Sequence, residues 1–103
     1  MSEGAHDAQD ALDAAVFRRL LHHLDGRKDV QNIDLMILAG FCRNCLSRWY
    51  EEEASKLGHN VDRETSRERI YGMPYTQWKR EHQPPATEEQ LAAFAALQPH
   101  KEG

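Results

Sequence analysis

The chain has 103 residues, with 13 Lys and Arg residues against 17 Asp and Glu residues, and its net charge is −4. This length supports one domain with a single modest core and leaves no room for a second domain. The longest apolar run, residues 35–42, is much shorter than the roughly 20 residues of a membrane-spanning helix, and the acidic N-terminus argues against a secretory signal. We therefore expect one domain over residues 1–103, with flexible ends at about 1–7 and 100–103.

Apolar residues recur at helical spacing through most of the sequence, and helix start and stop residues bound each stretch. Gly26 and Gly58 end the two longer stretches, because glycine enters the left-handed conformation without a Cβ penalty. No stretch alternates with the period of two that a strand would show. The predicted helices cover residues 8–25, 33–57, 63–71 with Asp62 as N-cap, about 74–82, and about 88–98 with Thr87 as N-cap. The expected fold is all-α: a compact orthogonal array or bundle of about five helices, two long and three shorter.

The segment 33–57 carries apolar side chains over a broader face than a surface helix shows, so we expect burial on more than one side. Gly40 lies within this segment and costs up to about 1 kcal/mol of helix propensity. We therefore expect Gly40 to mark the close approach of another helix. Four shorter partner helices cannot cover so broad a face, and the chain is expected to form a homodimer.

Cys42 and Cys45 form the one recognisable chemical spacing in the sequence, C-x-x-C, and on a helix both thiols would lie on the same side. A chain with two cysteines and no secretory signal is typical of a reducing compartment, so we expect a cytoplasmic protein. A redox pair places its first cysteine at a helix N-terminus, whereas about nine helical residues are predicted to precede Cys42. The simplest interpretation is that both cysteines are small apolar residues of a buried helix face.

A metal site needs ligands beyond this pair, because two thiolates supply half of a tetrahedral shell. Zinc-finger spacing is missing, since no second histidine follows His59 at the required distance. The alternative is a site that joins Cys42 and Cys45 to a distant His59 or His82, and such a site would hold one zinc or iron ion.

Residues 72–79 form a second distinctive segment, in which two aromatic residues and a Met surround a Gly-x-Pro turn. Tyr75 and Trp78 combine apolar area with a polar group, as does Trp49 on the second long helix. These three residues are the candidate surface for a ligand or partner. The competing interpretation is a corner that packs two helices, which is the more common role of clustered apolar residues.

Signals for catalysis and for nucleic-acid binding are weak. The sequence has no Gly-x-Ser-x-Gly nucleophile motif and no glycine-rich phosphate loop, which lowers the expectation of an enzyme without deciding it. The basic residues between 63 and 80 alternate with acidic ones, as on a solvated helix face. With a net negative charge, they predict weak binding of nucleic acid at most. These basic residues are Arg63, Arg67, Arg69, Lys79 and Arg80.

Several strings resemble a small bacterial family catalogued as domain-of-unknown-function family 1244. The most specific strings are Phe-Cys-Arg-Asn-Cys-Leu at 41–46 and Gly-Met-Pro-Tyr at 72–75. The resemblance implies an all-helical domain of about this length with an unassigned biochemical role, so no catalytic residue carries over. The strings that carry it are residues 29–36, 39–50 and 71–75, with the pairs Trp78-Lys79 and His82-Gln83.

These observations favour a small helical binding or assembly module that is homodimeric and has no assignable reaction. The alternative is a thiol or metal-binding protein that uses Cys42 and Cys45 in a structural, sensing or redox role. A weak nucleic-acid binder is the third interpretation.

Overall fold

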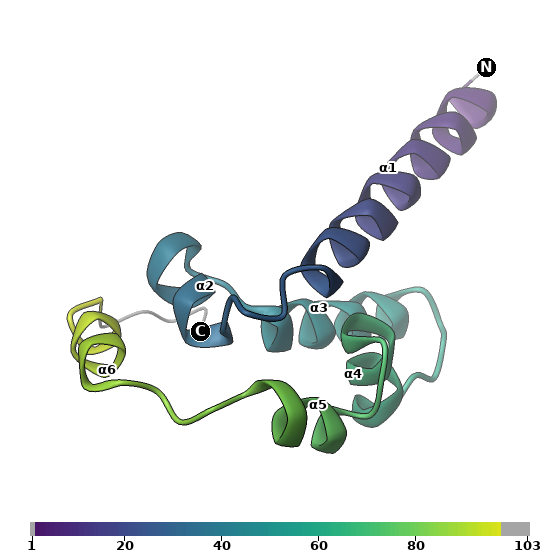
Figure 1. Cartoon of the computed structure of the whole chain (residues 1–103). Coiled ribbons are helices and arrows are strands. Elements are labelled where there is room, and N and C mark those ends of the chain that lie inside the picture. Colours follow the sequence, from purple (N-terminus) through teal and green to yellow (C-terminus); the bar gives the residue numbers. More distant parts are fainter. Residues whose placement is uncertain (1, 98–103) are drawn as a thin grey trace.

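A computed structural model describes residues 2–97 of the chain. Within them the chain forms six α-helices and no strand (Figure 1), so the all-helical prediction is confirmed and the expected number of about five is one short. The predicted end of the last helix at about residue 98 and the predicted flexible end at 100–103 lie outside the described residues. The helices are α1 (Ser2–Asp25), α2 (Asn32–Ala39), α3 (Arg43–Lys56), α4 (Arg63–Tyr71), α5 (Tyr75–His82) and α6 (Glu88–Ala95).

The prediction of one continuous helix over 33–57 is wrong, because this segment forms two helices that meet at a corner. α2 ends at Gly40, whose backbone is left-handed (φ 79°, ψ 10°) and whose N–H donates to the Met36 carbonyl at 3.0 Å. Cys42 is then extended (φ −144°, ψ −175°) and is the N-cap residue of α3. A left-handed residue ends a helix, and glycine adopts this conformation without steric cost. Gly40 is therefore a helix stop and does not mark a close approach of helices.

Two of the shorter helices, α4 and α6, begin at the N-cap residues that the sequence predicts. At the start of α4, the Asp62 carboxylate accepts a hydrogen bond from the Thr65 N–H at 2.8 Å, and Gly72 (φ 76°) ends the helix. At the start of α6, the Thr87 N–H donates to Gln90 Oε1 at 2.8 Å and the Gln90 N–H donates to Thr87 Oγ1 at 3.0 Å. These boundaries depend on local side-chain bonds, so the sequence alone can place them.

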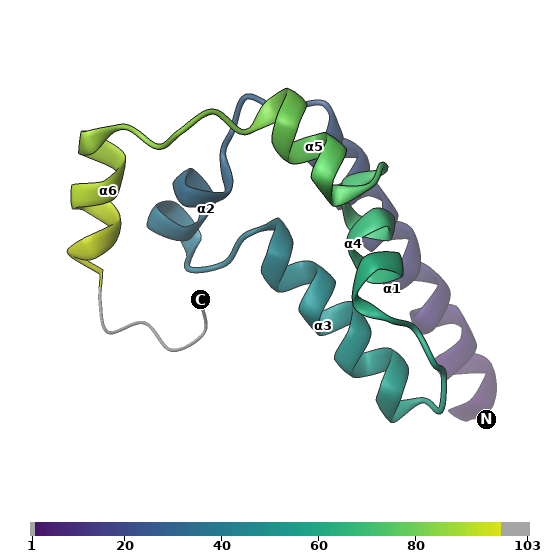
Figure 2. The same cartoon turned by 90° about the horizontal axis from the view of Figure 1, so that it is seen from below.

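The helices pack in pairs along the chain (Figure 2): α3 lies against α4, α4 against α5, and α2 against α6. The segment 33–57 is thus packed in part by α4 and α6 of the same chain, whereas Leu38 and Leu57 remain 84% and 75% exposed. A main core joins α1, α3, α4 and α5, and a smaller cluster lies at the corner between α2 and α3. The main core contains Leu21, Leu24, Leu46, Ile70, Tyr71 and Trp78, and the smaller cluster contains Met36, Cys42 and Cys45.

α1 departs from a compact arrangement. It begins at Ser2 and not at the expected residue 8, and its first turns extend away from the other helices (Figure 1). The molecule measures 54 × 29 × 24 Å with a radius of gyration of 15.8 Å, whereas a compact chain of this length would have a radius of about 13 Å. None of the helices in the described residues is both long enough and apolar enough to span a membrane.

Candidate functional site

The cysteine pair lies at the N-terminus of α3, inside the smaller core cluster. Cys42 caps the helix, Cys45 lies in its first turn, and their Sγ atoms are 4.0 Å apart without a disulfide. The expectation that helical residues precede Cys42 is wrong, because the chain turns at Gly40. The pair therefore has the position of a redox dithiol, but Cys42 is only 7% exposed and Cys45 only 2% exposed.

The surroundings of the pair suit neither a reactive thiolate nor a metal ion. Burial raises the pKa of the Cys42 thiol above its ordinary value of 9.0, and a protonated thiol is a poor nucleophile and a poor ligand. His59 is exposed in the loop after α3, and the His82 ring lies 5.8 Å from the Trp78 ring. Among residues 2–97, no three His, Cys, Asp or Glu side chains are grouped so that they could hold a metal ion. The four predicted ligands are not brought together, which does not favour zinc or iron.

Arg43, the residue after Cys42, anchors the linker between α1 and α2. It is 2% exposed, and its guanidinium donates to the carbonyls of Val30 at 2.8 Å and Arg27 at 3.0 Å. The guanidinium also lies 5.0 Å from the centroid of the Trp78 ring, and burial lowers the pKa of Arg43. A buried cation requires such partners, because desolvation without them is strongly unfavourable.

Two asparagines and a tyrosine extend this network across the fold. Asn32 Oδ1 accepts from Arg43 Nη1 at 3.1 Å, and Asn32 Nδ2 donates to the Tyr71 hydroxyl at 3.0 Å. The Tyr71 hydroxyl donates to Asn44 Oδ1 at 2.6 Å, and burial raises the pKa of this phenol. The string Cys-Arg-Asn-Cys thus joins the α1–α2 linker, the start of α3 and the end of α4.

The three candidate aromatic residues have different environments. Trp78 is 1% exposed and lies in the main core, which fits the helix-corner interpretation. Trp49 is half-buried and stacks on Phe41 with ring centroids 6.0 Å apart. Tyr75 is half-buried and lines a cavity, with Arg67 over its ring at 4.5 Å.

The basic residues of α4 and α5 lie among carboxylates. Arg67 pairs with Glu64 at 3.6 Å, and Arg80 pairs with Glu81 at 3.7 Å. A hollow of about 200 Å³ between α3 and α4 is lined by basic side chains that include Arg67, but Glu51 also lines it. These carboxylates offset the cationic charge, as on a solvated face.

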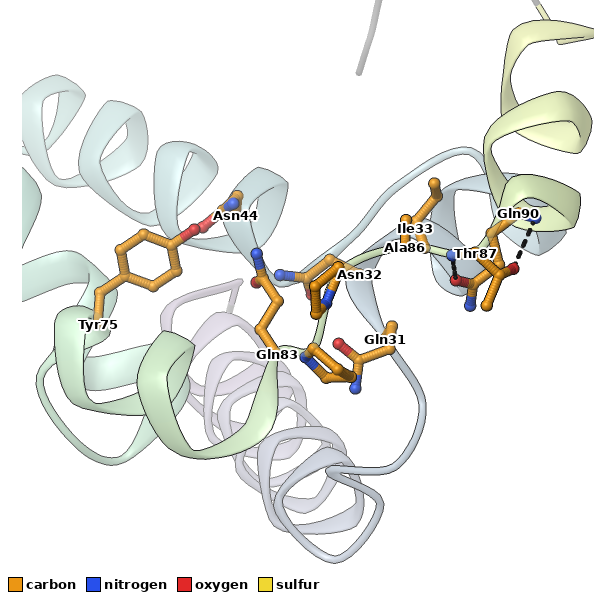
Figure 3. Close-up of a pocket in the computed structure, with 11 residues that line it drawn as sticks. Gln31, Asn32, Ile33, Asn44, Tyr75, Gln83, Ala86, Thr87 and Gln90 are labelled. Carbon is orange, nitrogen blue, oxygen red and sulfur yellow. Dashed lines mark hydrogen bonds between the residues drawn. The ribbon is translucent and has the colours of Figure 1, made fainter.

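A larger polar cavity of about 290 Å³ lies where the starts of α2, α3 and α5 face the linker 83–87 (Figure 3). Its volume is at the lower end of the range for small-molecule sites. Figure 3 shows the carboxamides of Gln31, Asn32 and Gln83 pointing into one space, with Tyr75 and Asn44 to one side. Every residue of its lining is uncharged: Gln31, Asn32, Ile33, Asn44, Tyr75, Gln83, Pro84, Pro85, Ala86, Thr87 and Gln90.

Sequence reasoning identified only Tyr75 among these lining residues. The lining comes from separate segments that approach one another only in the folded chain, so no local spacing connects them. One signal did exist, because several lining residues lie within the strings that carry the family resemblance. These residues are Gln31, Asn32, Ile33, Asn44, Tyr75 and Gln83.

Comparison with known protein families matches residues 30–96 to the family described as "Protein of unknown function (DUF1244)". The matched range contains the cysteine pair and the whole lining of the polar cavity, whereas α1 precedes it. A comparison with curated proteins found no match. Because the family match covers most of the chain and confirms the resemblance of its strings, this chain belongs to the DUF1244 family.

Proposed function

We propose that the protein is an assembly module that pairs with a second copy of itself through α1. The observation that carries this proposal is an exposed apolar stripe on that helix. Leu12, Val16 and Leu20 recur every four residues, and they are 66%, 65% and 36% exposed. Side chains at this spacing share one helix face. Such a stripe on a projecting helix is typical of an interaction surface.

The first turns of α1 need a partner for their stability. Residues 7–13 are all exposed and pack against no core. Most helical stability in proteins comes from tertiary packing of an apolar face, and these turns find no such packing within the chain. A second copy offers an identical stripe, and each large apolar side chain that becomes fully buried contributes roughly 1.5–3 kcal/mol.

The stripe and the charges of α1 favour an antiparallel pair. The stripe is symmetric about Val16, so an antiparallel partner places Leu12 opposite Leu20 and Val16 on the two-fold axis. An antiparallel pair also places the acidic half of one helix beside the basic half of the other, whereas a parallel pair would align like charges. The acidic half contains Asp7, Asp10 and Asp13, and the basic half contains Arg18, Arg19, His22 and His23, with Asp25 as the one acidic residue at its end.

Cysteine cross-linking tests both the pairing and its direction. A mixture of Leu12→Cys and Leu20→Cys chains should form disulfide-linked dimers under mild oxidation, and Val16→Cys should cross-link alone. Leu12→Cys alone should not, because its two copies would lie about 12 Å apart along the helix axes, beyond the reach of a disulfide. The control is Leu57→Cys, at a 75% exposed position on α3's C-terminal side.

Two results would contradict the proposal in different ways. Cross-linking of every single variant of α1 to itself would indicate parallel pairing. No cross-link above that of Leu57→Cys in any variant or mixture would mean that α1 does not meet a second α1.

A further inference from the structure

The polar cavity between α2, α3, α5 and the linker 83–87 is built for an uncharged ligand. Its lining has no charged side chain, although 29% of the residues in the chain are charged. A phosphate or carboxylate group is normally held by Arg or Lys side chains, which this lining lacks. The cavity therefore favours a ligand that makes hydrogen bonds without carrying charge.

Some of the carboxamides in the lining are bonded at both the oxygen and the nitrogen within the protein. Gln90 Oε1 accepts from the Thr87 N–H, and Gln90 Nε2 donates to Asp34 at 2.9 Å. Asn32 is held at its oxygen by Arg43 and at its nitrogen by Tyr71. Bonds at both ends of each carboxamide hold these two side chains in fixed orientations in the wall of the cavity.

Gln31 presents a buried acceptor that has no donor in the described part of the chain. Its Nε2 donates to the His82 carbonyl at 2.8 Å, which fixes the direction of the carboxamide. Its Oε1 is buried and lies toward the first-turn backbone N–H of Asp34 in the capping box of α2, without a hydrogen bond to it. A buried acceptor in this state is unfavourable, so a ligand N–H that reaches it gains binding energy.

Asn44 and Gln83 supply complementary groups. Asn44 Oδ1 is occupied by the Tyr71 hydroxyl at 2.6 Å, which leaves the amide nitrogen of Asn44 as a donor toward the cavity side that it lines. Gln83 is exposed at the cavity rim, and its carboxamide offers both a donor and an acceptor. Ile33 and Ala86 add apolar contact area.

We infer that this cavity binds a short, uncharged segment of extended peptide, held through its backbone amides by Gln31, Asn44 and Gln83. Each peptide group carries one N–H and one C=O, which matches an acceptor at Gln31, a donor at Asn44 and both at Gln83. A nucleoside fits less well. Bases are usually held by stacking on an aromatic face, and cations already lie over the Tyr75 ring at 4.5 and 5.5 Å.

Nuclear magnetic resonance titration of the ¹⁵N-labelled full chain tests this inference. The probe is N-acetyl-Ala-Ala-N-methylamide, an uncharged peptide without free termini. It should shift the side-chain amide signals of Gln31, Asn44 and Gln83 in a saturable manner. The matching ester, in which an oxygen replaces one peptide N–H, should bind about tenfold more weakly, since a hydrogen bond to a buried acceptor is lost.

Substitutions separate the cavity from the rest of the surface. Gln83→Met should weaken peptide binding several-fold with the fold intact, because the residue is exposed. The matched control is Gln77→Met, which changes the same residue type on α5 outside the lining and should leave binding unchanged.

Three outcomes would overturn the inference. The first is no shift of the three side-chain signals with the peptide at about 10 mM, a concentration that would detect even very weak binding. The second is tighter binding of adenosine than of the peptide, which would indicate a nucleoside site. The third is an equal loss of binding in Gln83→Met and Gln77→Met.

Discussion

Arg43 is held by main-chain carbonyls of the linker that precedes α2, at 2.8 Å from Val30 and 3.0 Å from Arg27. A third bond, to Asn32 at 3.1 Å, uses the same planar guanidinium. Lysine carries the same charge, but its single ammonium cannot reproduce this planar set of donors. Arg43 is thus a residue whose shape matters as much as its charge.

We predict that Arg43→Lys lowers the free energy of unfolding by roughly 2–4 kcal/mol, because buried carbonyls lose their donors. Urea denaturation followed by circular dichroism measures this change, at one fixed protein concentration. The control is Arg63→Lys at the exposed start of α4, which should change stability by about 0.5 kcal/mol or less. Equal effects of the two substitutions would mean that Arg43 does not hold the linker.

The Cys42 thiol makes the stability of the protein fall at alkaline pH. Burial raises the pKa of this thiol in the folded chain above its ordinary value of 9.0. Above pH 9.0 the unfolded chain therefore releases a proton that the folded chain keeps. Since the folded state then binds more protons, stability is fully present below this pH and falls as the pH rises, by up to about 1.4 kcal/mol per pH unit.

Cys42→Ala should make this alkaline loss of stability shallower, and the slope of unfolding free energy against pH between about 9 and 11 measures it. The raised pKa of Tyr71 leaves a residual slope in the variant. An unchanged slope in Cys42→Ala would show that the thiol titrates alike in both states.

Gly40 determines where the segment 33–57 turns, and therefore where α3, which carries the cysteines, begins. Its left-handed backbone (φ 79°) ends α2 and lets the chain turn so that Cys42 caps α3. Alanine in this conformation costs about 1–2 kcal/mol. Without the turn, Arg43 could not reach the linker carbonyls.

Gly40→Ala should therefore destabilise the protein by about 1–2 kcal/mol. The matched control is Gly26→Ala, because Gly26 has no positive φ and an added Cβ would lie at an ordinary 3.5 Å from the His23 carbonyl oxygen. Gly26→Ala should be neutral, or stabilising by up to about 1 kcal/mol. Thermal unfolding of both variants distinguishes them, and similar losses would contradict the role given to Gly40.

The sequence predicted the helices whose ends depend on local bonds. Asp62 and Thr87 begin α4 and α6 as expected, because each acts on backbone groups within its own turn. Gly40 was misassigned because glycine in an apolar run fits both a helix interior and a helix stop. Tertiary contacts decide between them, and Arg43 reaching Val30 is one such contact.

The candidate sites were harder to predict for the same physical reason. The C-x-x-C spacing was visible, but its burial follows from the packing of α2, α3 and their neighbours. The polar cavity joins Gln31, Asn44 and Gln83 from distant parts of the chain. Carboxamides carry no periodic signal, so only the folded chain brings them together.

In the molecule as a whole, α1 is the helix that packs only partly against the core. Leu21 and Leu24 secure its C-terminal end, whereas Leu12 and Val16 remain exposed on a projecting helix. An antiparallel pair of α1 helices would cover this stripe and align opposite charges. Stability should then rise with protein concentration, because association favours the folded state.

The mass of the untagged protein in solution is the first measurement to make on assembly through α1. Sedimentation equilibrium at micromolar concentrations should give twice the 11.9 kDa of one chain. Val16→Asp should give the single-chain mass, and Leu57→Asp should remain a dimer. A mass of 11.9 kDa for the wild-type protein at every concentration, or a dimer of Val16→Asp, would contradict assembly through α1.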